Sequence, residues 1–370
     1  MSRIVIAGDF TTVERGKEAI HQHTAFDKEI TKILSEADIS ILNLETPVVT
    51  SFAKPIFKIG ESLKTDEETI SYLKESGINV VTLANNHFND YGLEGINDTI
   101  QALKKEGIDF VGGGRNEEEL RRILYKEIED TKIAFLNYCE TEFSIQEGYG
   151  SNPLSPITLF YNIKEARSNA DVIVVIIHGG NERYKLPSPR MQYLYRYIVD
   201  LGANAVINHH QHYYSGYELY HGTPIYYGIG NFFFDDPAGN KSWTKGYMVE
   251  LILDNKYISS YNLIPYIQCQ NNEICTRRMN KKETEEFQKD IEQLNNVILN
   301  EKLLQEKFIK FCNRKKTNYW IDLTPYSNRY MRALCKRGFL PKFTNRIRKL
   351  KILNNIRCES HRDVLIESLK

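Results

Sequence analysis

The sequence predicts an α/β fold in which buried strands alternate with amphipathic helices. Short runs rich in Val and Ile alternate with stretches of helical spacing from residue 1 to about residue 250, and this alternation is typical of a layered α/β domain. Most of the Val/Ile runs are unbroken, as expected for strands that are buried on both faces. The predicted strands are residues 4–7, 39–42, 79–83, 133–137, 172–177 and 205–207.

Four segments between these strands place apolar residues at helical spacing and charged residues on the opposite face. The predicted helices are residues 28–36, 66–76, 93–106 and 189–200. Two later segments, residues 247–253 and 257–267, alternate more regularly and are separated by Asp254-Asn255-Lys256. This pattern predicts an antiparallel hairpin that closes the domain.

The character of the sequence changes after about residue 270, where charged, helix-forming sequence runs from residue 281 to residue 310. We therefore predict an α/β domain over residues 1–270 and a mainly helical, basic C-terminal region over residues 271–370. From Met331 to the C-terminus, eleven Lys and Arg residues stand against three Asp and Glu residues. This basic tail either forms a patch that contacts a membrane surface or nucleic acid, or forms a solvated amphipathic helix that packs on the main domain.

The composition argues against a nucleic-acid-binding surface, a disulfide-linked protein and a membrane-spanning protein. The 48 basic and 48 acidic residues balance, which argues against a surface built for nucleic acid. The six cysteines contain no Cys-x-x-Cys pair and fit reduced thiols. The apolar run before Gly8-Asp9 is only four residues long, and no apolar run approaches the roughly 18 to 20 residues that span a bilayer. We therefore expect a cytoplasmic protein, peripheral at the membrane if the basic tail binds there.

Polar side chains that can bind metal ions follow five of the predicted strands. Taken singly each is weak, because an Asp after a strand is more often a helix cap or turn residue, and a His there is more often structural. The carboxyl ends of strands in open α/β sheets, however, are where ligands bind. The candidate metal ligands are Asp9, Glu45, Asn86, His178, His210 and His212.

The chemistry of these donors indicates a pair of divalent ions. Carboxylate, amide and imidazole groups together favour Mn, Fe, Zn, Co or Ni, which the sequence does not distinguish, over Ca or Mg. Two such ions, typically about 3.5 to 4 Å apart, activate water and neutralise charge in an in-line displacement. The sequence therefore predicts hydrolysis of phosphoester bonds.

The motifs that carry these residues resemble those of CapA-like proteins, the poly-γ-glutamate capsule-biosynthesis branch of the calcineurin-like metallophosphoesterase superfamily. The matching motifs are Gly8-Asp9, Asn43-Leu44-Glu45-Thr46-Pro47 and residues 83–92, 178–182, 208–212 and 230–234. The resemblance covers roughly residues 1 to 250. It implies a layered metallophosphatase-like β-sandwich flanked by helices.

The resemblance also implies roles for individual residues. It assigns Asp9, Glu45 and His212 to a first ion. Glu45 as a bridge, Asn86, His178 and His210 would hold a second ion. His87 would face the leaving group as a catalytic proton donor, and Asp90 would orient it, although Asp90 is equally well explained as part of a turn that starts a helix.

Some positions depart from the family pattern or stay open. Asp9-Phe10-Thr11 lacks the second histidine of the wider superfamily, and Gln211 replaces a proline. His209 should point away from the ligands, because side chains alternate in an extended segment. For Glu182, Arg183 and Asn231, a structural hydrogen bond is favoured over a contact with substrate or site.

These observations together predict a metal-dependent hydrolase of phosphoester bonds that acts in the biosynthesis of a capsule or surface polymer, either poly-γ-glutamate or a polysaccharide. Its substrate would be a phosphorylated or polymer-linked small molecule, and capsule-synthesis proteins would be its candidate partners. The alternative is a non-catalytic assembly factor with a vestigial metal site. Retention of all the candidate residues favours activity.

Overall fold

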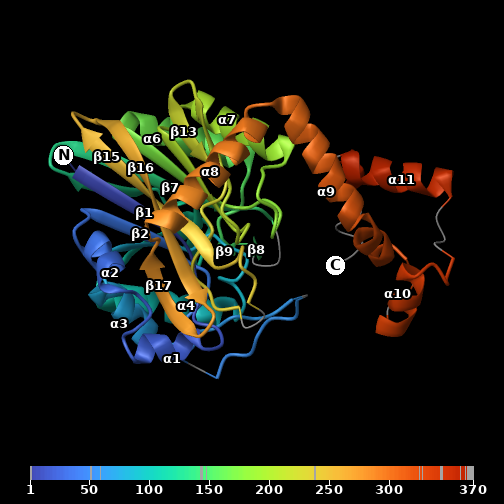
Figure 1. Ribbon diagram of the computed structural model, residues 1–370, viewed down its shortest axis with the longest axis horizontal. Coiled ribbons are helices and arrows are strands. Elements are labelled where there is room, and N and C mark those ends of the chain that lie inside the picture. Colours follow the sequence, from blue (N-terminus) through green and yellow to red (C-terminus); the bar gives the residue numbers. More distant parts are fainter. Residues whose placement is uncertain are drawn as a thin grey trace. The chain divides into compact units, whose positions relative to one another are not determined.

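The computed structural model describes residues 2–50, 52–58, 60–141, 145–146, 148–236, 239–324, 326, 328–341, 345–358, 360–362 and 364. Strands and helices alternate through most of the first 280 residues, and the strands form two large sheets (Figure 1). Each predicted strand lies within an observed strand or overlaps one, and each predicted helix overlaps an observed helix. The predicted α/β class is confirmed.

The first sheet is built around β1 in the order β17-β16-β15-β1-β2-β3-β4, with β14 also pairing with β1. Strands β1 to β4 are parallel, whereas β15 and β16 form the predicted antiparallel hairpin. The strands are β1 (Ser2–Phe10), β2 (Ile39–Leu44), β3 (Val80–Thr82), β4 (Asp109–Val111), β14 (Asn231–Phe233), β15 (Lys245–Asp254), β16 (Tyr257–Gln270) and β17 (Glu273–Arg278).

The second sheet has the order β12-β13-β11-β10-β7-β6, and a small third sheet has the order β5-β9-β8. The second sheet contains β6 (Leu124–Ile128), β7 (Thr131–Cys139), β10 (Val172–His178), β11 (Ala205–His209), β12 (Tyr217–Tyr220) and β13 (Thr223–Tyr226). The third contains β5 (Gly113–Gly114), β8 (Ile145–Gln146) and β9 (Tyr149–Ser151). Strands β7, β10 and β11 are parallel.

The two large sheets face each other across aromatic side chains. The ring of Tyr247 on β15 lies 6.3 Å from that of Tyr226 on β13, and the ring of Tyr261 on β16 lies 6.1 Å from that of Tyr217 on β12. The neighbour of Tyr247, Met248, belongs instead to the core beneath the helices that cover the first sheet. This alternation is expected for strands buried on both faces.

Helices cover both sheets. Residues of α1 (Gly16–His21), α2 (Lys28–Ser35), α3 (Glu67–Glu75) and α4 (Gly92–Glu106) share one core with Val5 and Ala7 of β1. Helices α6 (Pro156–Asn169) and α7 (Pro189–Leu201) pack against β7, β10 and β11. Helix α6 was not predicted, because exposed Phe160 and Tyr161 lie beside buried Leu159 and obscure the helical spacing. A short α5 (Glu117–Arg121) follows β5.

The main unit extends beyond the predicted boundary at residue 270. Residues 1–305 form one compact unit and residues 306–370 another. β17 pairs with β16, and Phe287 on α8 (Lys281–Ile298) places its ring 5.6 Å from that of Tyr247. Helix α8 is therefore part of the main unit, because its apolar face is needed to cover the sandwich.

The charged, helix-forming sequence of residues 281–310 is helical as predicted and is divided between two helices. α8 ends at Ile298, and α9 (Glu301–Asp322) begins after Asn300, whose Oδ1 accepts a hydrogen bond from the backbone N of Leu303 at 3.0 Å. Asn is a favoured residue at such a helix start. Two further helices follow, α10 (Arg329–Lys336) and α11 (Arg346–Arg357).

Part of the predicted basic tail, residues 342–344, 359, 363 and 365–370, lies outside the described residues. Within the described part of the chain, none of the helices combines the length and the apolar character that a membrane crossing requires.

One close contact between backbones shapes the end of β1. A Cβ atom on Gly8 would lie 1.8 Å from the carbonyl O of Gly230, so only glycine fits at position 8. This approach lets the next residue, Asp9, pair with Asn231 of β14 on one side while it pairs with Asn43 of β2 on the other. The Gly-Asp motif therefore places a carboxylate where three strands meet.

Candidate metal centre

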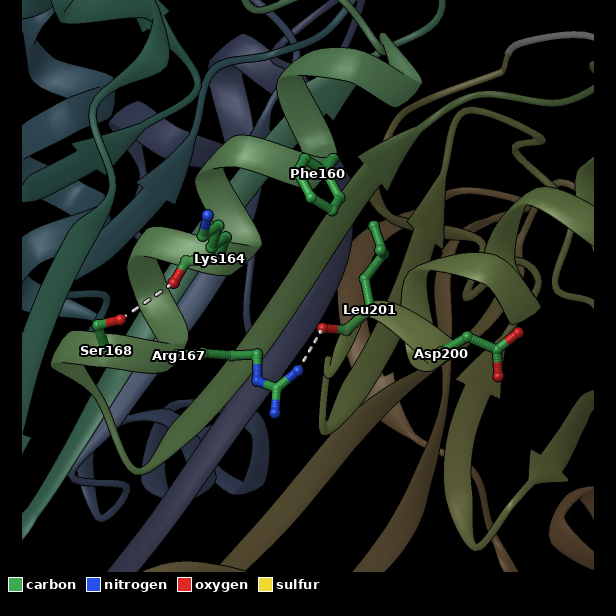
Figure 2. A pocket seen from close by; sticks show the side chains of 6 residues that line it. All are labelled: Phe160, Lys164, Arg167, Ser168, Asp200 and Leu201. Atoms are coloured by element: carbon green, nitrogen blue, oxygen red, sulfur yellow. Dashed lines mark hydrogen bonds between the residues drawn. The ribbon is translucent and has the colours of Figure 1, made fainter.

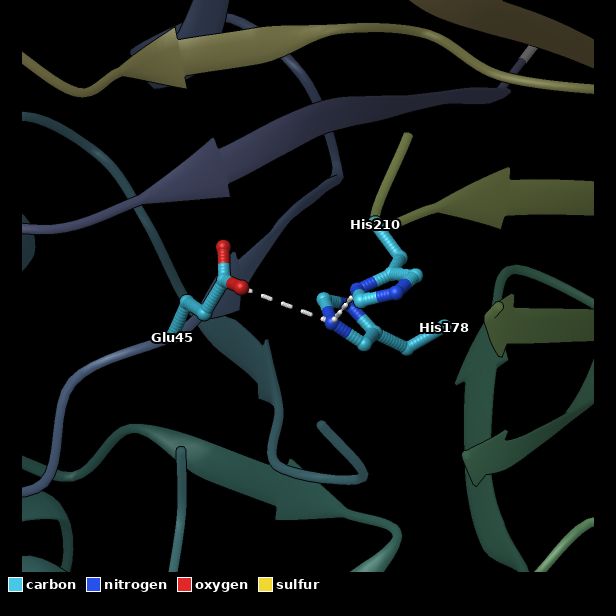
Figure 3. A group of neighbouring side chains, drawn as sticks. All are labelled: Glu45, His178 and His210. Atoms are coloured by element: carbon cyan, nitrogen blue, oxygen red, sulfur yellow. Dashed lines mark hydrogen bonds and ion pairs between the residues drawn. The ribbon is translucent and has the colours of Figure 1, made fainter. Parts of the chain in front are cut away.

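The six predicted ligands lie in one cluster between the two sheets. The donor atoms of Asp9, Glu45 and His212 all lie within 4.8 Å of one another, and so do those of Glu45, His178 and His210. Glu45 is common to both groups, and its carboxylate faces the two imidazole rings (Figure 3). The structure therefore brings together the two donor sets that the family resemblance implied.

Asn86 lies on the His178 side of the cluster. His178 Nε2 is 3.0 Å from Asn86 Oδ1, 3.0 Å from His210 Nδ1 and 3.4 Å from Glu45 Oε1. An amide oxygen, a carboxylate and two imidazole nitrogens thus surround one small volume. These are donors that a borderline divalent cation accepts.

Asp9 lies on the other side, where backbone and amide groups orient it. Its Oδ1 accepts a hydrogen bond from Asn43 Nδ2 at 2.7 Å, and its Oδ2 accepts one from the backbone N of His210 at 3.1 Å. His212 Nδ1 lies 3.6 Å from Asp9 Oδ2 and 2.9 Å from Asn231 Oδ1. Asn231 therefore makes the structural hydrogen bond that the sequence favoured, and Asn43 was missed although it belongs to the Asn-Leu-Glu-Thr-Pro motif.

The electrostatics of the cluster favour the metal-binding protonation state in two of its groups, the carboxylate of Asp9 and the imidazole of His178. Burial alone would raise the pKa of Asp9, but a hydrogen bond with His212 and the charges of nearby histidines lower its pKa below the usual range. Burial, followed by repulsion from His210, lowers the pKa of His178 well below its usual value. An ionised carboxylate and a neutral imidazole are what metal binding requires.

The backbone of the second histidine motif is strained. His210 and His212 have φ angles of 80° and 59°, in a region that non-glycine residues rarely adopt and that costs roughly 1 to 3 kcal/mol each. β11 ends at His209, so the following residues are not extended and simple alternation does not explain their directions. The left-handed backbone conformations of His210 and His212 therefore set the directions of these two side chains. His209 does not belong to any of the donor groups found among the described residues.

His87 and Asp90 form a pair beside the cluster. His87 Nδ1 lies 2.8 Å from Asp90 Oδ2, and Asp90 is fully buried. The carboxylate of Asp90 also accepts a hydrogen bond from the backbone N of Leu63, at 2.7 Å, and pairs with the ammonium group of Lys58. Asp90 thus makes the orienting contact with His87 that was predicted. It also belongs to the turn before α4, the other role that the sequence allowed. Lys58 was missed because nothing in its local sequence marks it.

Glu182 is a further residue at the edge of the cluster. Its carboxylate, His210 and His212 have donor atoms within 4.8 Å of one another, although Glu182 is exposed. The sequence favoured a structural hydrogen bond for Glu182, and a place among candidate metal donors was not predicted. A third carboxylate here could supply the donor that the missing second histidine of the first motif leaves out.

A small cavity of about 160 Å³ opens next to the His178 side and is lined by Cys139, Glu140, Thr141, His178, Gly180 and His210. Glu140 accepts a hydrogen bond from the backbone N of Gly180 at 2.9 Å and pairs with Arg190. Burial would raise the pKa of Glu140, but these two contacts lower it. The cavity therefore joins the candidate centre to a charged rim.

A larger cavity of about 430 Å³ lies elsewhere, at the outer surface formed by α6 and α7 (Figure 2). It is lined by Phe160, Lys164, Arg167, Ser168, Asp200 and Leu201, and Arg167 Nη1 there donates to the carbonyl O of Leu201 at 3.4 Å. None of the predicted site residues lines it. Size alone does not mark the functional site in this protein.

We expect metal binding to weaken as the pH falls. Burial lowers the pKa of His212, but its hydrogen bond to Asp9 and the charge of that carboxylate raise the pKa above the usual value. A proton on His212 must leave before a cation binds, so the Kd for Zn²⁺ or Mn²⁺ should rise by up to about tenfold per pH unit below this raised pKa. Calorimetric titration between about pH 8 and pH 6 measures this, and a Kd that does not change with pH would contradict it.

The fold is a two-sheet α/β sandwich, and carboxylate, amide and imidazole donors gather at the ends of its strands. The protein is therefore an α/β protein with a candidate metal centre. The model of the family described as "Bacterial capsule synthesis protein PGA_cap" matches residues 3–236. The chain therefore belongs to this bacterial capsule synthesis family, and the predicted resemblance to CapA-like proteins is confirmed.

Individual proteins show the same similarity. The chain is 32% identical over 254 residues to the capsule biosynthesis protein CapA of Bacillus anthracis, a match that covers 65% of this chain and 61% of that protein. It is 31% identical over 241 residues to the PGA biosynthesis protein CapA of Bacillus subtilis (strain 168), covering 63% and 60%. The match thus spans about three fifths of the length of these relatives.

Among solved structures, a protein described as a novel phosphatase from Mycoplasma pneumoniae shares 17% sequence identity with a TM-score of 0.47, covering 72% of this chain and 93% of that one.

Proposed function

We propose that this protein is a metal-dependent hydrolase of phosphoester bonds that acts in the biosynthesis of a bacterial capsule or surface polymer. The observation that carries the proposal is the position of Glu45, whose carboxylate belongs to two separate groups of buried metal donors. A carboxylate shared in this way is the arrangement expected of a bridge between two divalent ions. The membership of the chain in the capsule synthesis family supports the biological setting.

The residues fit such ions in their chemistry. Asp9, Glu45 and His212 would hold one ion, and Glu45, Asn86, His178 and His210 would hold the other. When bound, the ions would supply a nucleophilic water at neutral pH and neutralise charge on the phosphoryl group. Asn43 and Asn231, which contact Asp9 and His212, would fix the orientation of these ligands from behind.

His87 would handle the proton of the reaction. Asp90 is a carboxylate and only accepts hydrogen bonds, so the 2.8 Å contact places a proton on Nδ1 of His87. Nε2 is then the nitrogen that can donate to the oxygen of the leaving group when the ring is protonated. The substrate would be a phosphorylated or polymer-linked small molecule, for which the charged rim at Glu140 and Arg190 offers contacts.

Two further parts of the proposal concern location and partners. The family relationship suggests that capsule-synthesis proteins are partners of this protein.

The surplus of Lys and Arg after Met331 would suit a weak contact with an anionic membrane surface. Poly-γ-glutamate is the polymer that the family name and the Bacillus subtilis relative suggest.

Metal analysis coupled to an esterase assay tests the proposed function. We expect purified protein to retain divalent metal through gel filtration and to hydrolyse bis(p-nitrophenyl) phosphate or p-nitrophenyl phosphate in the presence of Mn²⁺. Treatment with EDTA should abolish the turnover, and added Mn²⁺ should restore it. Protein that is fully loaded with metal yet hydrolyses neither ester would contradict the proposal and favour an assembly factor with a structural metal site.

A further inference from the structure

Lys58 lies in a surface loop, yet its side chain is buried. The loop, described at residues 52–58 and 60–64, lies within the connection between β2 and α3, and a bridge between Val48 and Thr65 closes its base. Phe52 and Phe57 in the loop are exposed, whereas the side chain of Lys58 is only 4% exposed. A buried ammonium group is unfavourable unless it is paired, so its partner has to be a strong one.

That partner is Asp90, which holds the loop at three points. The ammonium group of Lys58 pairs with Asp90 Oδ1, the backbone N of Leu63 donates to Asp90 Oδ2 at 2.7 Å, and the backbone N of Ile56 donates to the carbonyl O of Asp90 at 2.9 Å. One fully buried residue thus anchors positions early and late in the loop. The loop is fixed to the turn that also carries His87.

His87 depends on the same carboxylate. Its Nδ1 lies 2.8 Å from Asp90 Oδ2 and 3.3 Å from Lys58 Nζ. With Oδ1 held by the ammonium group, the carboxylate cannot rotate without breaking the ion pair, and Oδ2 stays directed at His87. The loop, the carboxylate and the imidazole therefore behave as one unit.

We propose that Lys58 is a positioning residue, which acts through Asp90 to fix the tautomer and the orientation of His87. The 52–64 loop is accordingly a strap whose docked position makes His87 competent to donate a proton. This inference rests on the proposed function for its chemical consequence, but the contacts themselves do not depend on a bound metal or on a substrate.

The first test uses two esters that differ in how much they need a proton donor. Nitrophenolate leaves readily without a proton, whereas phenolate needs one, so loss of a general acid affects phenyl phosphate more. With Mn²⁺ present, we expect Lys58→Met to lower kcat by about 10²-fold on phenyl phosphate and by less than about tenfold on p-nitrophenyl phosphate. KM and metal content should not change.

Two variants control this test. Lys54 is an exposed lysine of the same loop, so Lys54→Met removes the same charge without touching Asp90 and should leave both rates unchanged. Lys58→Arg keeps a cation that can reach the carboxylate, and it should restore part of the rate on phenyl phosphate. Equal losses on both esters in Lys58→Met would overturn the positioning role, because a general defect does not discriminate between leaving groups.

The second test needs no activity. Hydrogen exchange of the amides of Ile56 and Leu63 should be faster in Lys58→Met than in wild type and Lys54→Met, and the ¹⁵N shifts of the His87 ring should show loss of the single Nδ1–H tautomer. Failure of wild type to hydrolyse either ester would refute the proposed function alone. Exchange and ring shifts in Lys58→Met that match those of Lys54→Met would refute the strap.

Discussion

Replacing Glu45 with glutamine should reduce bound metal more than any other single substitution in the cluster. Glu45 belongs to both of the donor groups whose members are all buried, whereas His178, His210 and His212 each belong to one of these two. The loss in affinity should exceed the roughly 10- to 100-fold typical of groups that merely support ligands. Glu45 is fully buried, and glutamine has nearly the same size, so the substitution should fit the same space and the fold should persist. Metal content after dialysis, measured by mass spectrometry beside circular dichroism, gives the result.

Substitutions at other positions serve as controls for the loss of metal expected in Glu45→Gln. Glu94 on α4 is exposed and belongs to none of the donor groups found among the described residues, so Glu94→Gln should retain all the metal. His178→Ala removes a donor from only one group, so it should lose the ion on that side and keep more metal than Glu45→Gln does. Asp9→Asn, Asn86→Ala and His210→Ala should likewise lose metal without unfolding. A Glu45→Gln protein with wild-type metal content would refute the bridging arrangement.

His87→Ala should have the opposite signature, with metal retained and turnover lost. His87 is absent from the donor groups found among the described residues, and its Nδ1 is directed to Asp90 instead. A proton donor typically contributes 10²- to 10⁴-fold to the rate, so kcat should fall by about that factor while metal content stays at the wild-type level. Steady-state kinetics on phenyl phosphate, together with metal analysis of the same preparation, measures both.

The control for this variant is His221→Ala, since His221 is a histidine on the surface. It should match wild type in both measurements. If His87→Ala loses metal in proportion to activity, then His87 supports the cluster and is not a proton donor, and the role proposed for it would be wrong.

The sequence predicts the candidate centre well because the rule behind it is local. A strand buried on both faces is visible as an apolar run, and the polar residue that ends it is visible as a break. Asp9, Glu45 and His178 each follow such a run. Parallel strands bring their carboxyl ends to one edge, which accounts for the meeting of Asp9 and Glu45 on the first sheet. His178 comes from the second sheet, so its approach to them depends on how the two sheets pack.

What the sequence does not predict depends on contacts between distant segments. Lys58 lies in a loop without periodicity, and only the folded chain brings it to Asp90, 32 positions later. The place of α8 in the main unit is similar, because its apolar face looks like that of any amphipathic helix until Phe287 is seen against Tyr247. In both cases the contact joins residues that are far apart in the sequence, and the sequence around each residue does not indicate which distant residue it will contact.

The position of β1 in the first sheet has a consequence for the order in which the chain folds. β1 pairs with β15, with Ser2 opposite Leu253, so β1 meets this neighbour only after most of the main unit has been translated. Closing so long a loop is slow, because its entropy is lost before the contacts form. The part of β1 that pairs with β15 therefore lacks this partner until β15 has been translated, and an unpaired strand edge is prone to aggregation.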